Sequence, residues 1–154
     1  MKYLAFFAFL ILSFQTAYAG TPLYEQTCIP VKIIDGARHV DLSMELAVTP
    51  DAVQHGLMFR DYLGLYNGMI FIFSPPQETA MWMKNTYIPL DMLFIDADEN
   101  IIKAHQGAVP HDLTPIWSGG TAQYVIELPN GAIERFDLKK GQKLKLPPNL
   151  FNGL

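Results

Sequence analysis

The sequence predicts a single, mainly β domain: a β-sandwich or jelly-roll-like barrel with one or two short helices. Its apolar stretches are short and are separated by Gly, Pro, Asn and Asp residues, which favour turns. Some of these stretches alternate apolar and polar residues, as a half-buried strand does. Only two brief segments suit a helix, and the chain shows no internal repeat. Many short strands with frequent turns are typical of sandwiches and small barrels.

The domain is predicted to begin with a β-hairpin followed by a short helix. Val31–Ile34 is apolar and leads into Asp35-Gly36, a common hairpin turn. Residues 40–48 alternate in polarity, which indicates a strand with one face in water. Thr49 then precedes Pro50, an arrangement that predicts a capped helix ending near residue 56.

The remaining elements are mostly strands. Residues 69–73 are apolar, and Ser74-Pro75-Pro76 should end that strand because proline cannot donate to a strand ladder. Residues 110–120 contain two prolines and two glycines, which predicts a loop. Asn130 is expected to cap one helical turn running to Phe136. Further strands are predicted over residues 80–85, 90–96, 101–109, 123–128 and 142–146.

The N-terminus predicts export. Lys2 is followed by the apolar run Tyr3–Phe14 and by Ala17-Tyr18-Ala19, the pattern of a signal peptide with its cleavage site over residues 1–19. The apolar run is shorter than the ~20 residues of a membrane-spanning helix. We therefore expect a periplasmic or extracellular protein with no membrane attachment after cleavage. It would comprise a lead-in and first strand over 20–40, a β domain over 41–146 and a loose tail over 147–154.

Charge and cysteine content exclude some classes of protein. Without Lys2 the chain carries 10 basic and 15 acidic residues, a formal charge of −5, and it shows no basic patch. Nucleic-acid binding is therefore not expected. Cys28 is the single cysteine, so no intrachain disulfide can form. No nucleophile signature surrounds Cys28, which favours a free thiol or an intermolecular disulfide over catalysis.

Several motifs together resemble one known family. The set comprises Val48-Thr49-Pro50, Gly56-Leu57-Met58-Phe59-Arg60, Gly68-Met69-Ile70-Phe71, Trp82-Met83-Lys84-Asn85-Thr86, Pro89-Leu90-Asp91, Val125-Ile126-Glu127-Leu128, Gly131 and Lys140-Gly141. It is similar to the bacterial and archaeal family called domain of unknown function 192, from about residue 42 to 146. The resemblance implies a compact β-sandwich or jelly-roll-like barrel, with no established activity, substrate or cofactor. His55 and the tail after residue 148 depart from the family pattern.

The segment from Met81 to Asp91 is the strongest candidate for a functional site. It places polar residues among apolar ones, and burying a polar group without a partner costs roughly 2–7 kcal/mol. If residues 81–86 are extended, Met81, Met83 and Asn85 share one face and Trp82, Lys84 and Thr86 the other. Asp91 either braces the connection from Asn85 to Leu90 or forms a charge pair with Lys84 at a pocket mouth.

Two further residues complete the candidate site. Arg60 could clamp a carboxylate or phosphate, or simply pair with a nearby acid such as Asp61 or Glu127. A solvated position is expected for Glu127, because glutamate is seldom fully buried. The candidate ligand-binding residues are Arg60, Trp82, Lys84, Asn85, Thr86, Asp91 and Glu127.

Four functions are compatible with this site, and binding of a small molecule is favoured. The ligand would be polar or anionic, or a glycan, in a pocket walled by Trp82, Tyr87 and Trp117. The alternatives are a domain recognised by another protein, and a hydrolase or lyase that uses Asp91 or Glu127. The last is a Cu(I)-binding protein that uses Met81 and Met83, although methionine is more often a core filler. Histidines 55, 105 and 111 lack metal-ligand spacing. No cofactor can be named, and the oligomeric state stays open.

Overall fold

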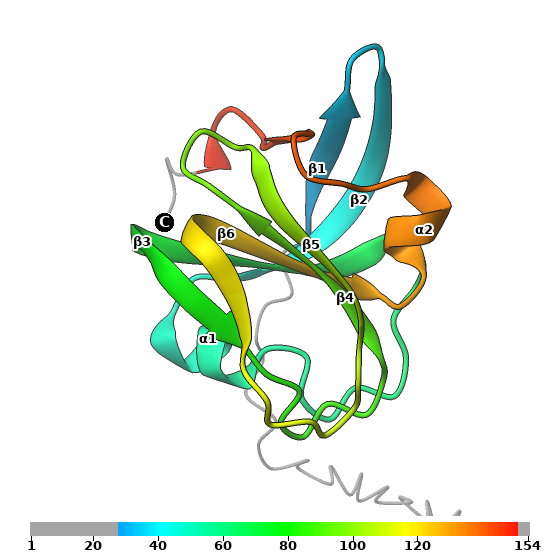
Figure 1. Ribbon diagram of the computed structural model, residues 1–154, viewed down its shortest axis with the longest axis vertical. Helices are drawn as coiled ribbons and strands as arrows, with labels where there is room; N and C mark the ends of the chain where they lie inside the picture. Colours follow the sequence, from blue (N-terminus) through cyan, green and yellow to red (C-terminus); the bar gives the residue numbers. More distant parts are fainter. Residues whose placement is uncertain (1–27, 151–154) are drawn as a thin grey trace, which may run out of the picture.

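The computed structural model describes residues 28–150, which form seven strands and two short helices (Figure 1). The predicted signal peptide, the lead-in before residue 28 and the end of the tail after residue 150 lie outside these residues. In chain order the elements are β1 (Cys28–Asp35), β2 (Arg38–Ala47), α1 (Pro50–His55), β3 (Asn67–Met81), β4 (Leu90–Ile95), β5 (Ile101–Ala108), β6 (Ile116–Pro129), α2 (Ala132–Phe136) and β7 (Lys143–Lys145).

The strands form one curled sheet in the order β5-β4-β6-β3-β2-β1-β7. β2 and β3 pair in parallel, with α1 in the connection between them, and the other neighbouring strands are antiparallel. The sheet curves into a half-barrel (Figure 1). The mainly β fold predicted from the sequence is confirmed. Neither helix in the described part of the chain has the length and hydropathy needed to cross a membrane.

The predicted hairpin and first helix are also confirmed. β1 and β2 pair from Cys28↔Glu45 to Asp35↔Arg38, with Gly36 at φ 59° in the turn. Thr49 accepts a hydrogen bond on its side chain from the backbone N–H of Ala52 at 3.2 Å. This contact satisfies one of the N–H groups that a helix leaves unpaired at its start.

Two predicted strand boundaries are wrong. The proline pair does not end a strand, because β3 runs through it with a cis Ser74–Pro75 bond and irregular pairing to β6 between Ile72 and Gln77. β6 begins at Ile116, inside the predicted loop, where Met81↔Ile116 and Ala80↔Trp117 are paired. Ser118 supports this irregular stretch, since its hydroxyl accepts from Thr79 N at 3.1 Å and donates to Gly120 O at 2.6 Å.

The sheet buries a separate hydrophobic cluster on each face. One cluster includes Leu93, Ile95, Ile126 and Leu128, and α2 packs against it through Ala132, Ile133 and Phe136. The other includes Met83, Met92, Phe94, Phe71 and Val125, and α1 packs against it through Ala52 and Val53. Alternate residues of β4 and β6 therefore face α1 and α2 in turn, as the pleat of a strand requires.

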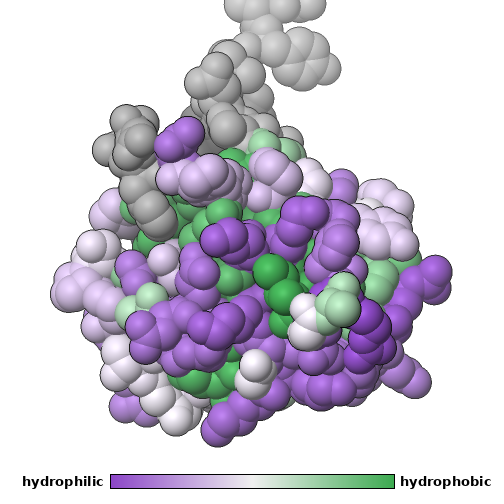
Figure 2. All heavy atoms as spheres, turned by 90° about the horizontal axis from the view of Figure 1, so that it is seen from above, coloured by the Kyte–Doolittle hydropathy of each residue, from purple (hydrophilic) through white to green (hydrophobic). Residues whose placement is uncertain are grey.

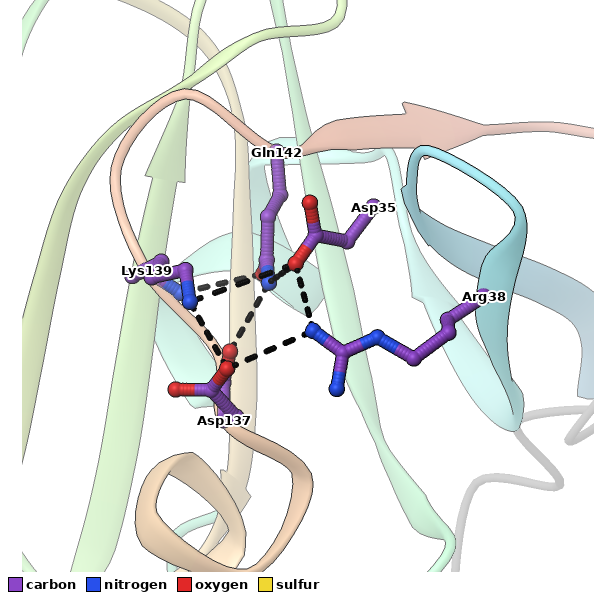
Figure 3. Close-up of polar contacts among 5 residues, drawn as sticks. All are labelled: Asp35, Arg38, Asp137, Lys139 and Gln142. Atoms are coloured by element: carbon purple, nitrogen blue, oxygen red, sulfur yellow. Dashed lines mark hydrogen bonds and ion pairs between the residues drawn. The ribbon is translucent and has the colours of Figure 1, made fainter.

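A polar network joins the β1–β2 hairpin to the segment after α2 (Figure 3). Gln142 is 5% exposed and holds its centre. Its side-chain N–H donates to Asp137 O at 2.8 Å and to Asp35 Oδ2 at 3.3 Å, and its Oε1 accepts from Lys139 N at 3.0 Å. Arg38 pairs with Asp35 at 3.0 Å and with Asp137 at 3.6 Å. In the view from above, hydrophilic residues cover most of the visible face, and hydrophobic residues show between them (Figure 2).

Candidate functional site

The segment after β3 is a turn and not the extended strand predicted for residues 80–85. Thr86 N donates to Met83 O at 3.1 Å, and Asn85 has a left-handed backbone with φ 53°. The turn buries Met83 and Thr86 and exposes Trp82 and Lys84. The predicted sorting of these residues onto two strand faces is therefore wrong, because the chain reverses at Lys84–Asn85.

Two loops support this turn by three backbone hydrogen bonds: the loop after α1 and the loop between β5 and β6. Phe59 N donates to Asn85 O at 2.8 Å, Met83 N to Asp112 O at 2.9 Å, and His111 N to Met83 O at 3.1 Å. Phe59 and His111, like Asn85, have positive φ, at 62° and 63°. Left-handed backbone is uncommon in residues other than glycine, and such strained positions cluster at functional sites. The loops lie at the end of the molecule drawn lowest in Figure 1.

Glu127 is a buried acid at the centre of the sheet, which corrects the solvated position expected from the sequence. It lies on β6 between Met69 of β3 and Met92 of β4, and its side chain is on the α1 face with Val125. Glu127 is 4% exposed, and its carboxyl makes no hydrogen bond or ion pair with any residue of the range 28–150. Burial raises the pKa of Glu127 from 4.5 to about 8, because the charged form has lost water without gaining a partner.

A small cavity lies beside this carboxyl. We call it the Glu127 cavity. Its volume is about 20 Å³, which is room for one water-sized group. Its wall combines the end of α1, the loop that follows, the end of β3 and the turn after it. The lining residues are Val53, Gln54, His55, Gly56, Leu57, Met58, Phe71, Met81, Trp82, Lys84, Thr86 and Glu127.

The structure thus brings together four of the seven candidate residues: Trp82, Lys84, Thr86 and Glu127. Trp82 lines the cavity and is also 51% exposed at the surface. Thr86 is buried, and its hydroxyl donates to Lys84 O at 3.3 Å. Asn85 does not line the cavity, but its side-chain N–H contacts Sδ of the lining residue Met58 at 3.8 Å.

Asp91 does not join the cavity. It is fully buried on the α2 face, where Oδ1 accepts from Gly107 N at 2.9 Å and Oδ2 accepts from Ile133 N at 2.8 Å. The predicted charge pair with Lys84 is therefore absent. Asp91 does have a bracing role, as the alternative prediction held, but it does not brace the connection from Asn85 to Leu90. Asp91 joins β5 and the start of α2. The prediction that Asn130 caps α2 is wrong, because the N-cap residue is Gly131, which has no side chain. Asp91 takes over the capping role by accepting from Ile133 N.

Arg60 and Trp117 also lie apart from the cavity wall. Arg60 forms an ion pair with Glu45 on β2, which is the simple pairing that the sequence left open, although with a different acid. Trp117 lines a separate groove between β5 and β6, where Lys103 donates to its carbonyl oxygen. Tyr87 contacts Phe59 edge-on at a ring distance of 6.0 Å and His111 at 5.5 Å. Phe59 and Tyr87 are both about half exposed.

Sequence reasoning missed Gly56, His55 and Met58 as parts of the site. Gly56 has φ 50°, and a Cβ atom there would lie 3.3 Å from Phe71 Cζ and 4.0 Å from Glu127 Oε2. The positive φ, together with the tight approach to the Phe71 ring, favours glycine at this position of the cavity wall. A glycine directly after a predicted short helix was the available signal, but it indicated a helix end and not a cavity wall.

Comparisons with known proteins agree with this architecture. Residues 31–146 match DUF192, described as an uncharacterized ACR. The crystal structure of a candidate transcription regulator from Sinorhizobium meliloti 1021 is 40% identical with a TM-score of 0.76, and the match covers 79% of this chain and 95% of that one. A protein of unknown function from Novosphingobium aromaticivorans is 35% identical with a TM-score of 0.77, covering 82% and 91%. No curated protein matches. The chain belongs to the DUF192 family.

Proposed function

We propose that this protein is a binding module for a small polar molecule that bears hydroxyl groups, such as a glycan fragment or a hydroxy acid. The observation that carries the proposal is the Glu127 carboxyl, which is buried beside a cavity and has no partner among the described residues. A polar group in that state costs free energy that a correctly placed ligand group can recover.

The size of the cavity limits what enters it. About 20 Å³ accommodates one hydroxyl group or one water molecule. The rest of the ligand would lie outside, against the exposed rings of Trp82 and Phe59. Sites that combine apolar and aromatic walls with a few fixed polar groups are typical of small-molecule recognition.

The charge of Lys84 favours a neutral or anionic group at the surface beside the cavity. With its pKa at about 8, Glu127 is mostly protonated at neutral pH and can both donate to and accept from a hydroxyl. Lys84 lines the same cavity and is exposed, so it can contact an anionic group at the surface. Arg60 has no part in this proposal because Glu45 already holds it.

Thermal denaturation with candidate ligands tests the proposal. Ligand binding stabilises the folded state by RT ln(1 + [L]/Kd), about 2.7 kcal/mol at 100 times Kd. We expect sugars, cell-wall glycan fragments or hydroxy acids to raise the melting temperature, and both Glu127→Gln and Lys84→Ala to reduce that rise. Arg38→Ala is the matched control, because Arg38 is an exposed cation in the polar network far along the chain from the cavity. If the ligand raises the melting temperature equally in all variants, the Glu127 cavity is not its binding site.

A hydrolase or lyase with Glu127 as its acid–base residue is the second candidate. A carboxyl with a raised pKa beside a cavity is the usual state of a general acid. Asp91 is no longer a candidate, since backbone N–H groups occupy both of its oxygens. Turnover of ester or glycoside substrates that Glu127→Gln abolishes would favour this candidate over simple binding.

The description of the Sinorhizobium relative does not alter the proposal. That protein is described as a candidate transcription regulator. This chain has a formal net charge of −4, whereas nucleic-acid binding depends on basic surfaces that neutralise phosphates. A gel-shift assay with mixed DNA fragments at low salt should therefore show no complex.

A further inference from the structure

The Glu127 cavity contains a second set of chemical groups that the proposed binding of a polar molecule does not use. Met58, Met81 and His55, whose side chains carry two thioethers and one imidazole, line the same small cavity as Glu127. We propose that this cavity is a Cu(I) site in which Met58 Sδ, Met81 Sδ and a ring nitrogen of His55 bind the metal.

The donor types select the metal. Thioether sulfur is a soft ligand that favours Cu(I), and imidazole binds copper as well. Harder or borderline ions such as Ca²⁺ and Zn²⁺ prefer carboxylate, imidazole and thiolate donors. Within residues 28–150 no group of three His, Cys, Asp or Glu side chains is placed to hold such an ion. Two methionines and one histidine on the wall of a cavity of about 20 Å³ therefore suit Cu(I) best.

Glu127 is an independent indication that the cavity accepts a cation. Its carboxyl is 96% buried and has no hydrogen bond or ion pair within the described residues. A bound monovalent cation would supply the opposite charge that this buried carboxyl lacks. Lys84 is a positive charge on the cavity wall and would repel a bound cation. Its side chain is exposed, so its ammonium group can remain in water, where this repulsion is screened.

The local structure holds Met58 and Met81 in the cavity wall. Met58 lies two residues after Gly56, which has φ 50°, and Asn85 Nδ2 contacts Met58 Sδ at 3.8 Å, which restrains the thioether without using both of its lone pairs. Met81 ends β3, where it pairs with Ile116. Met83 is different, because it is fully buried in the hydrophobic cluster on the α1 face and does not line the cavity.

This arrangement replaces the pair Met81 and Met83 that the sequence suggested for copper. That pair depended on an extended strand, whereas the turn at Lys84–Asn85 follows directly and sends Met83 into the core. Met58 comes from a different loop and takes its place. Because Met83 is chemically identical and lies two residues from Met81, it is a matched control.

Competition for Cu(I) with a chromophoric chelator such as bicinchoninate, under anaerobic and reducing conditions, tests the proposal. We expect one equivalent to bind, and Met58→Leu with Met81→Leu to weaken binding by at least about tenfold, as losing ligands does. His55→Ala should weaken it as well. Met83→Leu should leave the affinity unchanged. X-ray absorption of the loaded protein should show Cu–S scattering that the Met58/Met81 double variant loses.

The proposal is overturned if the protein binds no Cu(I), or if the double variant binds as tightly as the natural protein while its circular dichroism shows that it is folded. Methionine and leucine have similar volumes, so the double variant should fold. The same variant separates the two proposals. Polar-ligand stabilisation, measured with a copper chelator present, should survive in the Met58/Met81 double variant and decrease in Glu127→Gln. If the Met58/Met81 double variant loses copper binding and keeps polar-ligand binding, the copper site is supported. If it keeps copper binding and loses polar-ligand binding, the copper site is rejected.

Discussion

Asp91 and Glu127 are buried carboxyl groups on neighbouring strands of one sheet, and they face opposite sides of it. Asp91 lies on the α2 side, where two backbone N–H groups bond its two oxygens. Glu127 lies on the α1 side beside a cavity and has no such partner among the described residues. The comparison teaches that burial of an acid does not by itself distinguish a structural role from a functional one. The partners of the acid make that distinction.

The largest expected effect is the loss of the Asp91 carboxyl. Asp91→Ala leaves the N–H groups of Gly107 and Ile133 buried without acceptors, each at a cost of about 1–3 kcal/mol. We expect the free energy of unfolding, measured with urea, to fall by about 2–5 kcal/mol. Asp98→Ala is the control, since Asp98 is an exposed acid in a turn. A change at Asp91 no greater than at Asp98 would contradict a structural role for Asp91.

The next largest effect is expected at Glu127, where loss of the carboxyl should raise the stability of the protein, and only at high pH. Glu127 has its unfolded pKa near 4.5 and its folded pKa at about 8, so its contribution to stability is fully present below pH 4.5 and is lost as pH rises through about 8. In that window the folded state holds one proton more than the unfolded state. The free energy of unfolding should therefore fall by about 1.4 kcal/mol per pH unit from this group.

Glu127→Gln should remove that slope, because the amide has the same shape and does not ionise. Near pH 4 the natural protein and the variant should be about equally stable, and at pH 9 the variant should be more stable by a few kcal/mol. Urea unfolding across this range measures the difference. A variant that is less stable than the natural protein at pH 9 would show that Glu127 has a stabilising partner, like Asp91.

A smaller loss is expected at Gln142, the centre of the polar network in Figure 3. Gln142→Leu leaves Lys139 N and Asp137 O without their partners. The expected decrease is about 1–3 kcal/mol by urea unfolding. If the variant is as stable as the natural protein, water has replaced the side chain of Gln142. The polar network would then be more accessible to water than the hydrogen bonds of Asp91.

The smallest effect is expected at Arg38 in the same network. Its side chain is 73% exposed, and exposed ion pairs contribute at most about 1 kcal/mol. Arg38→Ala should therefore change stability by about 0.5 kcal/mol or less, and added salt should reduce even that difference. A loss as large as that of Gln142→Leu would mean that charge, and not hydrogen bonding of buried groups, stabilises this region.

Local patterns were sufficient to predict much of the fold. The β1–β2 hairpin follows from Asp35-Gly36, and the start of α1 follows from Thr49 and Pro50. β3 was predicted as two strands because a proline pair usually ends one. The neighbouring β6 supports this irregular stretch through Ser118, a contact between residues 39 positions apart that no local pattern reveals.

The candidate site was predicted only in part, because it also depends on contacts between residues distant in the chain. Polar residues among apolar ones drew attention to the segment after β3, where four of the seven candidates line one cavity, but that segment was predicted as a strand and is a turn. The environments of Asp91 and Glu127 were predicted poorly, because each depends on elements distant in the chain. Asp91 is bonded by residues from β5 and α2, and Glu127 is covered by the loop after α1. Sequence spacing alone does not show which strand neighbours which.

The most direct test of the contrast between the two acids is a carbon-13 NMR titration of the Glu127 carboxyl group, assigned by its absence in Glu127→Gln. We predict a titration midpoint at about pH 8, because the buried carboxyl lacks a partner that favours its charged form. A midpoint near the ordinary value of 4.5 would show that Glu127 is hydrated or paired in the folded protein, and would contradict its assignment as the unpartnered group of the cavity.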